Sequence, residues 1–272
     1  TTWARSNEIF VKEVKPVRVP PSILWKTAQA ALGPDKPVNS INLYNDPKKA
    51  ALFYSYSGSE GSLFYFDNIE YYNIVYIDPY TGKILGIFDE EVDFFNIVKM
   101  LHWSLLLDNA IGQQITGWAT LIFVIMLITG IVLWWPKNKS ARKQRLWFQW
   151  KDSTKWRRKN YDLHNIFGFY VATVAIIIAF TGMVWAFTWF KSAVYIAGSG
   201  SVAPPEVVTE LSTGDKRGSK DAAFDKAYLY AKEKHADAAG ISMSYPADET
   251  AALDVYVQQH EGAYYVSHRM QF

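Results

Sequence analysis

Two long apolar stretches in the middle of the chain constrain its fold more than any other feature. The first runs from Ile115 to Trp135 without a charged residue, and the second runs from Leu163 to Phe190 with His164 as its only titratable group besides tyrosine. At about 1.5 Å per residue, a helix over either stretch is long enough to cross a hydrocarbon layer of about 30 Å. The sequence therefore predicts a membrane protein with two transmembrane helices.

The segment that joins these stretches is strongly basic. Between Pro136 and Tyr161, its many Lys and Arg residues are opposed by a single acid, Asp152. Short loops of this kind stay on the cytoplasmic side, so we expect residues 137–160 in the cytoplasm and both flanks in the periplasm of a bacterial cell. Trp147, Trp150 and Trp156 among the cations indicate contact with membrane lipids rather than with nucleic acid.

The flanks on either side of the apolar stretches look like two copies of one α+β unit. In the first flank we expect a helix from Pro21, strands at 38–44, 50–56 and 72–77, and a return strand at 83–86. In the second flank we expect a helix at 221–235 and strands at 240–245, 252–258 and 263–271. An Ala-Ala-Leu sequence follows the first strand of each copy, at 50–52 and 251–253, which indicates an internal repeat.

The fold class that follows is an α+β membrane protein in which transmembrane helices join two periplasmic units, each a helix on an antiparallel sheet. The expected divisions are a first unit at 1–97, a transmembrane segment with a preceding interfacial helix at 98–136, the basic loop at 137–160, a second transmembrane helix at 161–190, and a second unit, incomplete at its C-terminus, at 191–272. The first core should contain Leu24, Ala28, Leu43, Leu52, Val75 and Ile77.

Two histidines at the ends of the apolar stretches are the candidate functional residues. His102 lies just before the first stretch, and His164 lies at the start of the second. Ionisable groups at membrane depth are costly and mark functional sites. In upright helices these residues would be on the order of 20 to 30 Å apart, near opposite membrane surfaces. Either histidine can also be an interfacial anchor, and 98–107 can lie along the membrane surface.

The remaining histidines and the glycines of the apolar stretches have simpler interpretations. His235, His260 and His268 show no metal-ligand spacing, and we interpret them as surface residues. Gly117, Gly130 and Gly182 suit helix packing more than cofactor clefts. Gly168 follows His164 by one turn, which would let a flat group approach the backbone.

Several motifs resemble one known family. YIDPYTGKILG at 76–86 resembles the closing hairpin of PepSY domains, and the segments that begin LHWSLLLDNAIG at Leu101 and NYDLHNIFG at Asn160 resemble the PepSY-associated transmembrane family. That family includes siderophore-iron reductases with two b-type haems. The resemblance implies that His102 and His164 each supply one iron ligand to a different haem, with the partner histidines on further helices before and after this span.

The resemblance also implies a function. Electrons would pass from a cytoplasmic flavin- or nicotinamide-dependent donor, through the two haems, to a ferric siderophore on the periplasmic side of the inner membrane. The sequence has no dinucleotide fingerprint, so the donor is expected to be a separate protein. The alternative is a noncatalytic membrane anchor whose PepSY units bind a periplasmic partner such as a peptidase.

Overall fold

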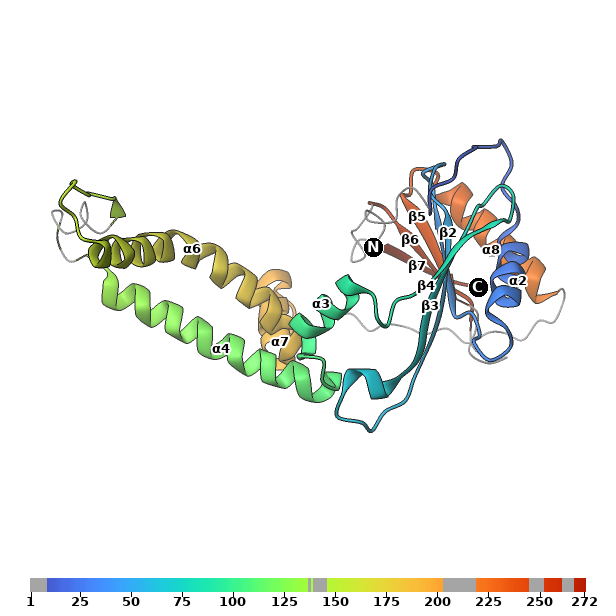
Figure 1. Ribbon diagram of the computed structural model, residues 1–272. Coiled ribbons are helices and arrows are strands. Elements are labelled where there is room, and N and C mark those ends of the chain that lie inside the picture. Colours follow the sequence, from blue (N-terminus) through green and yellow to red (C-terminus); the bar gives the residue numbers. More distant parts are fainter. Residues whose placement is uncertain (1–8, 137, 139–145, 203–218, 245–251, 261–266) are drawn as a thin grey trace. The chain divides into compact units, whose positions relative to one another are not determined.

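The chain folds into two units, one built around a sheet and one built from helices. The computed structural model describes residues 9–136, 138, 146–202, 219–244, 252–260 and 267–272 (Figure 1). The sheet unit combines both ends of the chain, Thr1–Met100 and Val207–Phe272, and the helical unit comprises Leu101–Glu206. The structure therefore brings the two flanks of the sequence into one compact unit.

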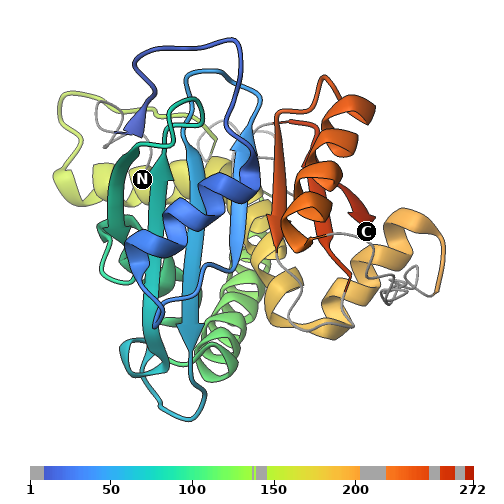
Figure 2. The same cartoon turned by 90° about the vertical axis from the view of Figure 1, so that its right-hand side faces the viewer.

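The sheet unit contains a seven-stranded antiparallel sheet with the strand order β4-β3-β2-β1-β5-β6-β7. Helices α2 and α8 lie on the same face of this sheet (Figure 2). The elements are α2 (Pro21–Leu32), β1 (Ser40–Tyr44), β2 (Ala51–Gly58), the short 3-10 helix η1 (Tyr65–Asn68), β3 (Ile69–Ile77), β4 (Ile84–Asp89), α8 (Lys220–Lys234), β5 (Gly240–Ser244), β6 (Asp254–Gln258) and β7 (Ser267–Gln271).

The two repeats share this sheet because their first strands pair with each other. In the antiparallel pairing of β1 with β5, Ile41 lies opposite Met243 and Leu43 lies opposite Ile241. The sequence predicts a separate sheet in each flank, and the structure corrects this expectation. A strand exposes a full row of N–H and C=O groups at each edge, and pairing β1 with β5 satisfies one such row in each repeat.

One hydrophobic core lies between the sheet and the two helices. It joins Leu24 and Ala28 of α2 to Phe224 and Ala231 of α8, all at most 1% exposed. Trp25 packs edge-on against Phe224, with ring centroids 5.4 Å apart. Because both repeats contribute to this core, neither helix covers a core of its own.

One of the six expected core residues lies elsewhere. Leu24, Ala28, Leu43, Val75 and Ile77 belong to the core under the helices, whereas Leu52 belongs to a smaller cluster with Ile74 and Tyr76. Neighbouring strand residues point to opposite faces, and Ala51 and Phe53 take the positions that face the helices. The expectation for Leu52 was therefore wrong by one residue of register.

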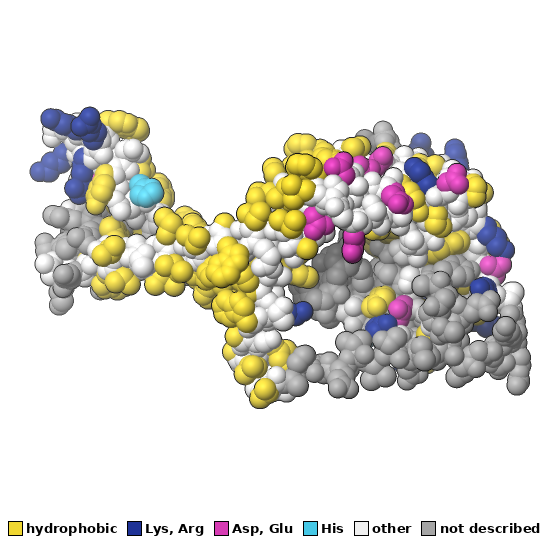
Figure 3. Space-filling view, turned by 90° about the horizontal axis from the view of Figure 1, so that it is seen from below, with side chains coloured by type: hydrophobic (Ala, Val, Ile, Leu, Met, Phe, Trp, Pro, Cys, Tyr) yellow, Lys and Arg dark blue, Asp and Glu magenta, His cyan; other side chains and the backbone are white. Residues whose placement is uncertain are grey.

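The helical unit contains two helices that are long and apolar enough to cross a membrane, α4 (Asn109–Trp134) and α6 (Trp156–Ala186). Only 11% and 22% of their most apolar windows are buried, so neither is the core helix of a soluble protein. Apolar side chains such as Ile125, Val132 and Ile178 are instead exposed, and patches of hydrophobic side chains lie along the surface of the long helices (Figure 3). Exposed apolar surface of this kind is typical of helices that cross a membrane.

Two shorter helices flank the spans. Helix α3 (Phe94–Ser104) precedes α4, and α7 (Thr188–Ser199) follows α6 after a break at Phe187. The second span was expected at 161–190, but α6 begins earlier and ends at Ala186. Close packing joins the spans where Gly117 meets α6, because a Cβ atom at this position would lie 2.5 Å from the Cβ atom of Ala186.

Candidate functional site

A hollow of about 540 Å³ lies between α3, α4 and α6 in the helical unit. This volume is within the range of about 300 to 1,000 Å³ that is usual for cofactor pockets. Its lining residues are His102, Trp103, Gln113, Thr116, Gly117, Thr120, Phe123, Ala175, Ile178, Ala179, Thr181, Gly182, Trp185 and Ala186. The hollow therefore combines a histidine with aromatic walls and many small side chains.

Small residues leave the α6 side of the hollow open. A Cβ atom added at Gly182 would meet no atom within 4 Å, and Ala175 and Ala179 line the same side. Trp103 and Trp185 close one part of the wall, with ring centroids 5.5 Å apart in an edge-on contact. A flat molecule can therefore approach the α6 backbone, as sequence reasoning expected near Gly168 but not near Gly182.

The corner between α3 and α4 fixes the position of His102. The Thr116 hydroxyl donates a hydrogen bond of 3.1 Å to the carbonyl oxygen of Trp103, the residue after His102. A Cβ atom at Gly112 would lie only 2.1 Å from the carbonyl oxygen of Ser104, so only glycine permits this close approach. Leu105 and Leu106 have φ values of 58° and 57°, which are strained for leucine and show that the surrounding packing determines this turn.

The imidazole of His102 is available to a ligand. It is exposed at the margin of the hollow, and it makes no hydrogen bond or ion pair with the residues that the structure describes. It belongs to α3, the helix that precedes the first span. Imidazole is a usual axial ligand of haem iron, and the volume of the hollow beside it is within the range for cofactors.

His164 occupies a different site on α6. Its side chain is exposed, and Gly168 lies one turn further along the helix, where an added Cβ atom would meet nothing within 4 Å. About 27 Å of helix separates His164 from Gly182 at the hollow. The structure therefore keeps the two candidate histidines apart, as their positions in the sequence predict. They cannot both bind the same metal ion.

Asp162 is a buried carboxylate beside His164 that sequence reasoning missed. It is 9% exposed, it accepts a hydrogen bond of 3.2 Å from the indole N–H of Trp150, and it pairs with the guanidinium of Arg158, whose Nε lies 3.0 Å away. The spacing of Arg158 and Asp162, which suits a pair on one helix face, was the available signal. These contacts hold the segment around Trp150 against the first turns of α6.

Aromatic residues mark both ends of the spans. Trp118 contacts Phe187 near one end, and Trp134 contacts Phe169 near the other, with ring centroids 5.3 Å and 5.0 Å apart. Trp118 and Trp134 are separated by about 24 Å of α4. Tryptophan favours the boundary between lipid and water, so these contacts are typical of the two interfacial belts of a membrane helix pair.

The three histidines of the C-terminal flank were interpreted as surface residues. Among the described residues, no group of three or more His, Cys, Asp or Glu side chains forms a metal site. His260 and His268 are exposed and His235 is half-buried. However, the rings of His235 and His268 stack on each other, which the sequence does not predict.

Comparison with known proteins identifies the family. The family model described as PepSY-associated TM region matches residues 2–268, which include the 76–86 hairpin and both histidine segments. No curated protein matches the sequence. Since the match covers nearly the whole chain, this protein belongs to the family of PepSY-associated transmembrane proteins.

Proposed function

We propose that this membrane protein conducts electrons across a bacterial inner membrane and reduces ferric siderophores on the periplasmic side. The observation that carries the proposal is the hollow beside His102, which pairs an available imidazole with a wall of small residues. Haem b supplies one-electron chemistry when bound, and the protein contributes ligands, orientation and a dry path.

Each histidine would serve one haem. His102 would donate a ring nitrogen at the hollow, and His164 would do so near the opposite membrane surface. Gly182 would let the flat ring approach α6 at the hollow, and Gly168 would do so beside His164. Each iron would need a second ligand from elsewhere, because the two histidines are too far apart to share one ion.

The direction of electron flow follows from the charges. The basic loop, with Arg157 and Lys159 among its cations, belongs on the cytoplasmic side, which would place His164 near the donor and His102 near the periplasm. The donor would be a separate flavin- or nicotinamide-dependent protein. Reduction would release iron from the siderophore, because hard oxygen ligands hold Fe(III) more tightly than Fe(II).

The haem content of purified full-length protein tests the proposal. His102→Ala and His164→Ala should each lower the pyridine-haemochrome content from about two haems to about one, since the sites share no ligand. Either change should abolish ferric-siderophore reduction, because a serial path fails at any broken step. His260→Ala is the matched control and should keep both haems.

Unchanged haem content in both variants would overturn the role of these histidines. A full-length protein without a dithionite-sensitive haem spectrum would favour the alternative, a membrane-anchored PepSY module that binds a periplasmic partner.

A further inference from the structure

We propose that His235 and His268 form a binding site for a divalent first-row transition-metal ion in the sheet unit. Their rings stack nearly parallel, with centroids 5.1 Å apart and an angle of 17° between the planes. The site is independent of the two histidines of the helical unit. Metal binding at this site can therefore be tested separately from the haem proposal.

Regular backbone structure holds both residues in place. His235 caps the C-terminus of α8, and its backbone N–H bonds to the carbonyl oxygen of Ala231 at 3.0 Å. His268 lies in β7 opposite the fully buried Val257 of β6. Because Val257 faces the helix-side core, its directly opposite partner His268 also lies on the face that carries α8. The ends of a helix and a strand thus bring the two imidazoles together.

The distance between the rings suits two imidazole ligands on one ion. Histidine χ2 rotates within a broad, roughly two-fold distribution, so modest rotations can turn one nitrogen of each ring toward a shared ion. An ion such as Zn²⁺ binds histidine nitrogens at about 2.0 to 2.1 Å. The ring planes are nearly parallel at a centroid separation of 5.1 Å, so at least one ring must turn about χ2 for both to point a nitrogen at one ion.

A third donor and the helix end add to the site. The side-chain amide of Gln259 lies 3.5 Å from Nδ1 of His235 and can present its oxygen after a flip. The C-terminal end of α8 carries partial negative charge that favours a cation. Charged residues also lie near His235 in the sequence. Lys232 lies over the ring of Tyr228 and Lys234 over the ring of Tyr230. The acid Asp237 follows two residues after His235.

The donor set defines the class of ion. Imidazole suits Zn²⁺, Cu²⁺, Ni²⁺ and Fe²⁺, whereas Mg²⁺ and Ca²⁺ prefer oxygen ligands. Two protein nitrogens leave the remaining coordination positions to water or to Gln259. The site is therefore an exchangeable one, unlike a closed structural zinc site with four protein ligands.

Metal titration of the full-length protein tests the proposal. The protein is purified in detergent with a histidine-free tag, stripped with a chelator and titrated with NiCl₂ or ZnCl₂ by calorimetry. We expect a component of about one equivalent that weakens at least tenfold in His235→Gln and in His268→Gln, and that remains in His260→Gln. MgCl₂ should give no such component.

A second measurement separates ligation from folding. The thermal midpoint without metal should be the same in the wild type and in both glutamine variants, whereas the rise in midpoint with NiCl₂ should be lost only in those two variants. Equal nickel and zinc affinity in the wild type and in both variants would overturn the proposal. Equal weakening in His260→Gln would do the same.

Discussion

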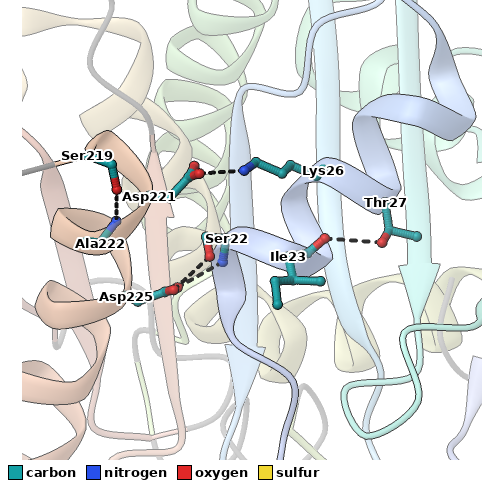
Figure 4. Close-up of polar contacts among 8 residues, drawn as sticks. All are labelled: Ser22, Ile23, Lys26, Thr27, Ser219, Asp221, Ala222 and Asp225. Atoms are coloured by element: carbon teal, nitrogen blue, oxygen red, sulfur yellow. Dashed lines mark hydrogen bonds and ion pairs between the residues drawn. The ribbon is translucent and has the colours of Figure 1, made fainter.

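The carboxylate of Asp225 accepts two hydrogen bonds from Ser22, one from the backbone N–H at 2.9 Å and one from the hydroxyl at 2.6 Å (Figure 4). The two residues are 203 positions apart in the sequence and lie on α2 and α8. Ser22 is in the first turn of α2, where backbone N–H groups have no partner within the helix. Asp225 of α8 thus accepts hydrogen bonds from the N-terminal turn of α2, which belongs to the other repeat.

Replacing Asp225 by Ala should therefore destabilise the sheet unit. Ser22 is 5% exposed, so its N–H and hydroxyl would lose their partner in a place with little access to water. We expect a loss of about 1 to 3 kcal/mol in the free energy of unfolding, measured by urea denaturation. Lys26→Ala, which removes the neighbouring exposed ion pair to Asp221, should cost less than about 1 kcal/mol. Equal effects of the two changes would contradict this assignment.

The contact between Ser22 and Asp225 also shows where sequence reasoning reaches its limit. Alternating apolar residues such as Ile41 and Leu43 identify β1, and helical spacing identifies α2. Neither pattern encodes which strand pairs with which, so the pairing of β1 with β5 could not be predicted. The Ala-Ala-Leu match located the repeat but not its alignment: Leu52 lies within β2, whereas Leu253 precedes β6.

The candidate site divides in the same way. His102 and His164 were predictable because ionisable residues are rare beside apolar stretches. The hollow was not, because it depends on how α3, α4 and α6 pack. Asp162 was missed because its burial results from the fold of the loop around Trp150, which composition does not reveal.

A large side chain at Gly182 should block the hollow. Gly182→Phe would place a ring in the space that an added Cβ atom finds empty, so the full-length protein should lose about one haem per chain. Gly182→Ala should keep it. Gly130→Phe is the matched control, since a Cβ atom added at Gly130 would also meet no atom within 4 Å, but Gly130 does not line the hollow. Full haem content and an unchanged spectrum in Gly182→Phe would exclude this hollow as the outer site.

Loss of the Asp162 carboxylate should loosen the basic loop. Asp162→Asn keeps the shape but weakens the charge-assisted contacts to Arg158 and Trp150. Trypsin should then cleave the loop several-fold faster in inside-out vesicles, as followed by fragment appearance on gels. The control is Asp152→Asn, an exposed acid of the same loop. An unchanged cleavage rate in Asp162→Asn would show that the contacts of Asp162 with Arg158 and Trp150 do not protect the loop from trypsin.

Reporter fusions should reveal the orientation of the spans. A fusion near Ser153 should behave as cytoplasmic, because the surrounding Lys and Arg residues oppose translocation, and a fusion after Gly200 should behave as periplasmic. Alkaline phosphatase is active only in the periplasm and β-galactosidase only in the cytoplasm, so the two reporters check each other. The reverse pattern of reporter activity would contradict the proposed direction of electron flow.

The stability of the sheet unit should fall at strongly alkaline pH. Burial raises the pKa of the Tyr228 hydroxyl above its usual value of 10.0, and nearby Arg18 only partly opposes this effect. The folded protein therefore keeps a proton that the unfolded chain releases above pH 10, so stability is complete below that pH and declines as the pH rises toward the folded pKa. Burial raises the pKa values of Tyr65 and Tyr72 in the same way.

Urea unfolding at several pH values between 9 and 11.5 measures this decline, which is at most about 1.4 kcal/mol per pH unit for each proton. Tyr228→Phe should remove part of the slope and leave the remainder to the other two tyrosines. Tyr230→Phe, at an exposed position of the same helix, should leave the slope unchanged. If Tyr228→Phe kept the full dependence of stability on pH, the loss of stability at alkaline pH would come from groups other than the Tyr228 hydroxyl.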